Sequence, residues 1–355
     1  AKSGSTAASP QNSMDFLRIS AGPSSQQVKK NDVKTLSEKP EQMTDNATDR
    51  PLVTFALFAY NQEEYIREAV EGAFAQTYEP LEIILSDDYS SDRTFEIMQE
   101  MAAAYDGSHD VKMRRNPENL GLANHFNRLT HLANGDILTV AAGDDISRPE
   151  RVSTAMAAFE KNPYLSFVEC GLAEFSDNGP LRNYQVSQTE RSFSLDDLIA
   201  NPKLGLVGAG RSYKKDILQA FPALLKDCPT EDSTCILRCL LRAEGFYDPT
   251  VLVERRLHDT NISTSNIASQ KLYNIRNQYH RDLAYARQTQ LRSTQTLDKT
   301  KLAVDQLMTA RVLRQLRREG HNIASAIYTV CKNTGAKTTL SSLYRALIYR
   351  IKINW

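Results

Sequence analysis

Three pairs of neighbouring carboxylates stand out among the groups in this 355-residue sequence that could do chemistry. They are Asp87 with Asp88, Asp144 with Asp145, and Glu231 with Asp232. At an effective dielectric constant of 20 and about 5 Å separation, two such charges repel by about 3 kcal/mol unless a positive group lies beside them. A folding argument alone does not require three such pairs, so each is a candidate for binding or catalysis.

The elements that carry two of these pairs alternate between strand and helix. Apolar runs at 52–58, 81–86 and 136–142 are typical of strands, and 111–115 continues the alternation. The pattern predicts helices over 63–76, 90–105, 122–133 and 149–162. This succession indicates an α/β protein with a mostly parallel sheet covered on both faces. In such sheets ligands bind outside the carboxyl ends of the strands, where Asp87–Asp88, Asp144–Asp145 and the "AYNQEE" turn all lie.

The later part of the chain carries the third acid pair and then a series of predicted helices. We expect a strand at 166–170, a turn, strand and helix start over 205–218, a helix from Glu231 closed by Gly245, and a strand over 250–263 that leaves the body. Helices follow over 270–288, 298–320 and 341–355. The predicted units are a polar, disordered tail (1–50), an α/β domain (51–267) and a basic helical region (268–355).

Charge is divided unevenly although the chain as a whole is neutral. Residues 268–355 hold 16 Lys and Arg against 4 Asp and Glu, whereas residues 1–267 hold 27 against 39. The basic region could face an anionic membrane or nucleic acid, or it could dock on the acidic domain. The five cysteines show no disulfide spacing, and Cys235 and Cys239, one helical turn apart, are expected in the core. A reducing cytoplasm fits best, with neither a secretion signal nor a membrane-spanning run.

Three segments resemble successive blocks of the family 2 glycosyltransferases. They are "PLVTFALFAYNQEEYIREAVEGAFAQTYEPLEIILSDDYSSDRT", "NPENLGLANHFNRLTHLANGDILTVAAGDDISRPERV" and "TEDSTCILRCLLRAEGFYDPTVLVERRLHDTNIS". The resemblance spans residues 51–265, and it implies the GT-A fold, a nucleotide-diphosphate sugar donor and a divalent cation, Mn²⁺ or Mg²⁺. Such a cation prefers carboxylate and phosphate oxygens and stabilises the departing diphosphate.

The resemblance also implies roles for residues of the donor site. Asp88, with Asp87, would recognise the nucleoside, Tyr60 would stack on the base, and Asn119 and Asn127 would contact its edge; Glu63 belongs to the same nucleotide-binding group. Asp145 would hold the metal and Asp144 would lie near the ribose or the metal's waters. Ala142 stands where many relatives carry a further Asp, so the metal would depend more on His258. Arg256, two residues before His258, offers a fork to phosphate oxygens.

The third acid pair would supply the general base of an inverting transfer. A carboxylate there would take the proton from the acceptor hydroxyl, and such a base typically contributes 10²–10⁴-fold to the rate. The family pattern favours Asp232 over Glu231. Acidic residues at a helix N-terminus are also stabilising without any catalysis, so the structural alternative stays open.

The sequence therefore predicts an inverting, metal-dependent glycosyltransferase. The donor would be a UDP-sugar, and the acceptor a hydroxyl of a bacterial surface polysaccharide or of a lipid-linked glycan precursor. No nucleic-acid partner is expected, and an oligomer is possible. The basic, apolar and aromatic segment 340–355 could touch the inner face of the plasma membrane, or it could pack on the protein or on a second subunit. A catalytically inactive sugar-nucleotide-binding scaffold and a nucleotidyltransferase are the alternatives.

Overall fold

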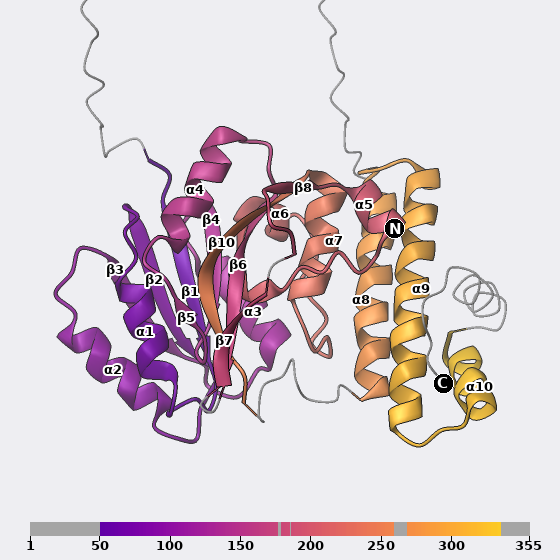
Figure 1. The fold of residues 1–355 in the computed structure, drawn as a ribbon, viewed down its shortest axis with the longest axis horizontal. Helices are drawn as coiled ribbons and strands as arrows, with labels where there is room; N and C mark the ends of the chain where they lie inside the picture. Colours follow the sequence, from indigo (N-terminus) through magenta and orange to yellow (C-terminus); the bar gives the residue numbers. More distant parts are fainter. Residues whose placement is uncertain (1–49, 177–178, 185, 259–267, 335–355) are drawn as a thin grey trace, which may run out of the picture. The chain divides into compact units, whose positions relative to one another are not determined.

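One sheet organises the chain from Val53 to Arg256 (Figure 1). The computed structural model describes residues 50–176, 179–184, 186–258 and 268–334, all of which belong to one compact unit, residues 46–355. The predicted tail 1–50, except Arg50, and the predicted helix 341–355 lie outside the described residues. The strands are β1 (Val53–Ala59), β2 (Leu81–Asp87), β3 (Asp110–Arg115), β4 (Ile137–Ala142), β5 (Ile146–Ser147), β6 (Phe167–Ser176), β7 (Gly179–Tyr184), β8 (Arg191–Phe193), β9 (Arg211–Lys214) and β10 (Gly245–Arg256).

The strand order explains why several strand ends reach one edge. Along the main path the order is β3-β2-β1-β4-β9-β6-β10-β5, with β7 on β6 and β8 on β10. Strands β3, β2, β1 and β4 are parallel to one another, and β6 is parallel to β10, whereas β9 runs antiparallel between β4 and β6. The prediction of a mostly parallel sheet is confirmed, and the four parallel strands present their carboxyl ends together.

Two expectations for the segment after Glu231 were wrong. The helix there ends at Arg242, and Gly245 is the first residue of β10 rather than a helix cap. A Cβ at Gly245 would lie 2.1 Å from the Phe167 ring, so the glycine is required by packing. The described part of the strand predicted at 250–263 does not leave the body, because β10 lies inside the sheet between β6 and β5; residues 259–263 lie outside the described residues.

Helices cover both faces of the sheet. The helices are α1 (Ile66–Phe74), α2 (Thr94–Ala104), α3 (Leu122–Leu132), α4 (Arg151–Lys161), α5 (Leu195–Ala200), the 3₁₀ turn η2 (Gly208–Gly210), α6 (Lys215–Gln219), α7 (Asp232–Arg242), α8 (Ser269–Gln288), α9 (Thr294–Arg318) and α10 (Ile323–Thr334). Alternate residues of β1 serve the two faces: Phe55 and Leu57 pack with α1, α2 and α4, and Ala56 and Phe58 pack with α3 and α7. This period of two is what a strand buried on both faces requires.

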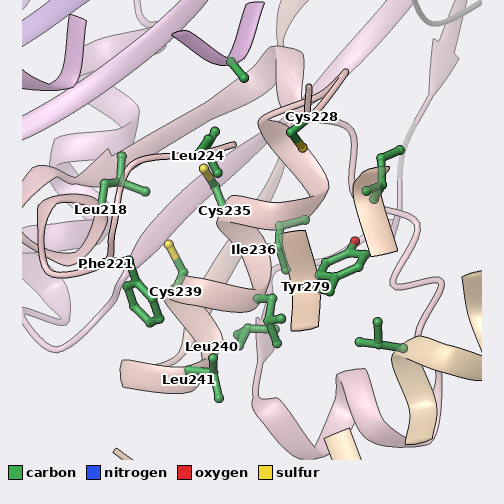
Figure 2. Packing of buried hydrophobic residues seen from close by; sticks show 14 of the residues in the cluster. Leu218, Phe221, Leu224, Cys228, Cys235, Ile236, Cys239, Leu240, Leu241 and Tyr279 are labelled. Atoms are coloured by element: carbon green, nitrogen blue, oxygen red, sulfur yellow. The ribbon is translucent and has the colours of Figure 1, made fainter. Parts of the chain in front are cut away.

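The basic helical region packs on α7 rather than standing apart. Helices α8 and α9 lie side by side (Figure 1), and α8 contacts α7. Figure 2 shows Cys235 and Cys239 of α7 among apolar side chains, with Tyr279 of α8 nearby, and both cysteines are fully buried. The predicted core position of these cysteines is confirmed, and the five cysteines are all free thiols. In the part of the chain that the structure describes, no helix is long and apolar enough to cross a membrane.

Candidate active site

The loops after β1, β2 and β4 lie side by side at the carboxyl edge of the sheet. The strands are in register, with Ala59 opposite Asp87 and Phe58 opposite Ala142. Two backbone hydrogen bonds continue this register into the loops, from Asp88 N–H to the Ala59 carbonyl (2.9 Å) and from Gly143 N–H to the Phe58 carbonyl (2.8 Å). Two of the predicted acid pairs are therefore carried on adjoining loops.

The first acid pair is buried and extensively hydrogen-bonded. Asp87 accepts from Ser90 N–H (3.0 Å) and forms an ion pair with Arg115 Nε (3.1 Å). Asp88 accepts from the backbone N–H groups of Leu120 and Gly121, both at 2.9 Å, and from the Asn116 side chain. A carboxylate has about four acceptor positions, so Asp88 retains room for one further donor such as a nucleoside N–H or hydroxyl. Sequence reasoning missed Arg115 and Asn116, which hold this pair.

The turn after β1 offers one open aromatic ring. The Tyr60 side chain is 47% exposed and is available for stacking. Asn61 has φ +51°, and it joins the loops by donating its N–H to Ser90 Oγ (2.9 Å) and accepting from Ser91 N–H (2.8 Å). Glu63 instead accepts from Arg93 N–H (2.8 Å) just before α2. The Glu63 carboxylate therefore braces α2, and its predicted role in nucleotide binding stays a prediction.

The two predicted asparagines lie in different surroundings. Asn119 is exposed, and its Oδ1 accepts from Gly121 N–H (2.9 Å), where the backbone turns through φ +74°. Asn127 is on α3, and its amide makes two hydrogen bonds to Leu224: Nδ2 donates to the carbonyl (2.9 Å) and Oδ1 accepts from the N–H (2.8 Å). The Asn127 amide thus fastens α3 to the segment before α7.

We expect Asn127→Ala to lower the free energy of unfolding by about 1–3 kcal/mol and to leave nucleotide affinity within two-fold of wild type. The loss follows because two partly buried backbone groups of Leu224 lose their partner. Urea unfolding and calorimetric titration with UDP would measure the two effects. Asn119→Ala, at an exposed position, is the matched control for stability. A large loss of UDP affinity in a folded Asn127→Ala protein would instead favour the nucleotide-edge contact predicted from the sequence.

The second acid pair meets the end of β10. His258 Nε2 lies 3.0 Å from Asp144 Oδ2, and Asp145 Oδ1 accepts from Arg256 N–H at 3.0 Å. Burial, followed by the neighbouring Asp144 charge, raises the pKa of Asp145 to about 7. An ionised Asp145 is therefore disfavoured unless a positive charge is added beside it.

These groups fit a divalent cation in their chemistry. Carboxylate oxygens suit Mg²⁺ and Mn²⁺, which are commonly held by one or two carboxylates plus substrate phosphates. Among the residues described, no group of three or more His, Cys, Asp or Glu side chains could hold a metal by itself. The phosphates of a bound ligand would have to supply the remaining oxygens.

Arg256 and His258 share an aromatic neighbour that sequence reasoning missed. The Tyr65 ring centroid lies 4.7 Å from that of His258 and 4.9 Å from the Arg256 guanidinium carbon. Phe175 lies on the guanidinium as well, at 4.5 Å, and Glu68 forms an ion pair with it. Arg256 is therefore a buried, oriented cation close to the second acid pair. Tyr65 falls within the predicted helix 63–76, and nothing in its spacing separates it from core aromatics.

The third acid pair begins α7. Asp232 accepts from Thr230 Oγ1 and from Ser233 N–H. Burial and the adjacent Asp232 charge raise the pKa of Glu231 to about 7. A pKa near the working pH suits a general base, so Glu231 remains a candidate beside Asp232.

A buried arginine and a glycine turn connect the second and third acid pairs. Arg151, 2% exposed, donates to Ser147 Oγ (2.8 Å) and to the Ala209 carbonyl in η2 (2.8 Å), and its charge acts on Asp145. At the adjoining Gly208, a Cβ would come within 2.4 Å of the Asp232 Cβ, so η2 packs directly on Asp232. Sequence reasoning missed Arg151, because its Pro-Glu-Arg context predicts only a helix start. It predicted a turn within 205–218 but gave that turn no role in the site.

Part of this chain is similar to a known protein family. Residues 54–221 match the family model described as "Glycosyl transferase family 2". The "Putative glycosyltransferase EpsE" of Bacillus subtilis (strain 168) is 34% identical over 129 residues, which are 36% of this chain and 46% of the relative. The "Glucosyl-dolichyl phosphate glucuronosyltransferase" of Haloferax volcanii is 30% identical over 113 residues, 31% of this chain and 35% of the relative. The chain thus spans less than half the length of these two relatives.

Solved structures show the same fold. Residues 1–349 of S. aureus TarS in complex with UDP-GlcNAc superpose with a TM-score of 0.53 at 15% identity, covering 74% of this chain and 82% of that one. The Pyrobaculum calidifontis mannosyltransferase PcManGT, in complex with GDP-Man and Mn²⁺, gives 0.52 at 15% identity, covering 86% and 82%. The predicted GT-A architecture is confirmed by this likeness.

Proposed function

Because residues 54–221 form a glycosyl transferase family 2 domain, we propose that this protein is an inverting, metal-dependent glycosyltransferase. It would transfer a sugar from a nucleotide-diphosphate donor to a hydroxyl of a surface polysaccharide or of a lipid-linked glycan precursor. The observation that carries the proposal is the connection of two acid pairs: Arg151, whose charge acts on Asp145, donates to the Ala209 carbonyl of η2 (2.8 Å), and η2 packs so closely on Asp232 that only a glycine fits at residue 208.

The two pairs suit the two halves of the reaction. When bound, Mn²⁺ or Mg²⁺ would be held by Asp145 and His258, with Asp144 near the ribose or the metal's waters, and would offset the charge of the departing diphosphate. Arg256 would donate to phosphate oxygens from its position over Tyr65. Asp232 would take the proton of the attacking hydroxyl, with Glu231 as the second candidate. In an inverting transfer the base and the leaving group lie on opposite sides of the anomeric carbon.

Donor and acceptor assignments belong to the same proposal. The open Tyr60 ring and the remaining acceptor position on Asp88 would receive a nucleoside, for which we propose uridine. One structural neighbour holds UDP-GlcNAc and another holds GDP-Man, so a guanosine donor is the competing outcome. We also propose the unit boundaries 51–267 and 268–355, a cytoplasmic site of action, and a peripheral membrane contact through 340–355, a segment outside the described residues.

A panel of UDP-, GDP- and dTDP-sugars tests the proposal by thermal unfolding with and without Mn²⁺. Ligand that binds the native state raises the unfolding midpoint, by an amount equivalent to about 2.7 kcal/mol at one hundred times the dissociation constant. We expect UDP-sugars with Mn²⁺ to give the largest rise and slow UDP release to follow. A rise without any turnover on acceptors or water would favour the inactive-scaffold alternative. No rise with any nucleotide sugar would contradict the proposed function.

A further inference from the structure

A second buried arginine, Arg211 of β9, contacts the backbone of the predicted base, Asp232. Its side chain is completely buried and paired with Glu169 of β6, which is 1% exposed. Arg211 Nε donates to Glu169 Oε2 (2.8 Å), and Nη1 donates both to Tyr213 Oη and to the backbone carbonyl of Asp232, each at 2.9 Å. The guanidinium thus joins two strands to the first residue of α7.

The Glu169 carboxylate of this pair also fixes the backbone just before η2. Val207, the residue before η2, donates its N–H to Glu169 Oε1. The next residue is Gly208, where a Cβ would come within 2.4 Å of the Asp232 Cβ. Glu169 and Arg211 therefore fasten both sides of one contact: the η2 turn on one side and the Asp232 backbone on the other.

The cost of burying such a pair is a reason to look for a role beyond stability. Removing two charges from water is expensive, and buried ion pairs are often no more stabilising than apolar residues of similar volume. In some proteins a buried ion pair is retained because it fixes one arrangement of the elements that it joins. In this protein the fixed geometry is that of Asp232 relative to η2, and η2 is held from the other side by Arg151.

We propose that Glu169 and Arg211 are positioning residues that set the location of Asp232 for proton transfer. The inference depends on the proposed function, because it assumes that Asp232 accepts the proton of the acceptor. Catalysis is sensitive to such placement, since a shift of about 1 Å can lower a rate about 10²-fold. Neither residue touches the substrate in this scheme, so the effect should appear in kcat and not in donor binding.

The chain offers a matched control in a second buried ion pair, which joins α7 to α8. Arg238 of α7 donates from Nε and Nη2 to Asp282 of α8 at 2.9 and 2.8 Å, and both side chains are at most 3% exposed. This pair joins the middle of α7 to α8 and makes no contact with Asp232 in the hydrogen bonds that the structure gives for it. Variants of the two pairs should therefore lose comparable stability but differ in catalysis.

The test compares Arg211→Lys and Glu169→Gln with Arg238→Lys and Asp282→Asn. The donor is the nucleotide sugar that gives the largest midpoint rise in the screen, and the readouts are nucleoside diphosphate release and amide hydrogen exchange. We expect Arg211→Lys and Glu169→Gln to lower kcat per folded molecule about ten-fold to 10²-fold, with donor KM within two-fold, and to speed exchange at the Val207 and Ser233 amides. The control pair should leave both readouts unchanged at equal folded fraction.

Three results are distinguishable. Equal kcat losses in both pairs, or no change at Val207 and Ser233, would overturn the positioning role while leaving the glycosyltransferase proposal intact. An Arg211→Lys protein as active as an active wild type would also overturn the positioning role and leave the glycosyltransferase proposal intact. A wild type that binds and cleaves no nucleotide sugar would overturn the proposed function, and the positioning role with it.

Discussion

Asp232→Asn is expected to lower kcat by about 10²–10⁴-fold while leaving the nucleotide-dependent rise in unfolding midpoint in place. The carboxylate is the predicted acceptor of the hydroxyl proton, and losing a general base typically reduces the rate by this factor. An amide of the same size keeps the hydrogen bonds to Thr230 and Ser233 within reach, so α7 should still begin at residue 232. Steady-state release of nucleoside diphosphate, together with a thermal scan on the same sample, measures both quantities.

Glu231→Gln is the control for this substitution. The two carboxylates are adjacent, and the Asp232 charge helps to raise the pKa of Glu231. If Asp232 is the base, removing the Glu231 charge should cost less than ten-fold in kcat. The opposite ranking, with Glu231→Gln the more damaging, would assign the proton transfer to Glu231, whose pKa of about 7 already suits it. Equal wild-type rates in both variants would remove this acid pair from the mechanism.

The fold could be predicted well where local pattern and burial agree. Phe55 and Leu57 alternate with Ala56 and Phe58 in a strand buried on both faces, and the following amphipathic helix α1 runs from Ile66 to Phe74 as its spacing indicates. Gly245 shows where this reasoning failed. A glycine after a helical pattern suggests a helix cap, but the space at Gly245 is taken by the Phe167 ring, a contact from a strand nearly eighty residues away.

The site shows the same division. Adjacent carboxylates at strand ends can be recognised in a sequence, because the two charges that repel each other are neighbours in the chain. The groups that make them tolerable are remote: Arg115 pairs with Asp87, and Arg151 acts on Asp145. Asn127 illustrates the converse, since a family pattern suggests a ligand contact while both ends of its amide hydrogen-bond to Leu224. Spacing therefore predicts which residues could do chemistry, and only the packed structure shows what already occupies them.

Asp145→Asn is expected to raise stability at pH 8 without a metal and to remove most of the stabilisation by Mn²⁺. Burial and Asp144 raise the pKa of Asp145 in the folded protein to about 7, above the ordinary 3.8. A raised acid pKa means that the folded state binds the proton more tightly than the unfolded state, so stability falls as pH rises from about 4 to 7. Without metal, the asparagine variant should equal wild type near pH 4 and exceed it at pH 8 by up to about 4 kcal/mol.

A divalent cation should invert that order. With Mn²⁺ and UDP at pH 8, wild type should gain stability because the cation favours the ionised Asp145, whereas the variant lacks that carboxylate and should gain little. Urea unfolding of both proteins at pH 4, 6 and 8, with and without Mn²⁺ and UDP, measures the free energy of unfolding in each condition. Asp136→Asn, an exposed position just before β4 and at the other end of that strand from Asp145, should keep the full metal response. An Asp145→Asn protein that responds to Mn²⁺ as wild type does would place the cation elsewhere, because the buried carboxylate at the end of β4 would then have no part in holding it.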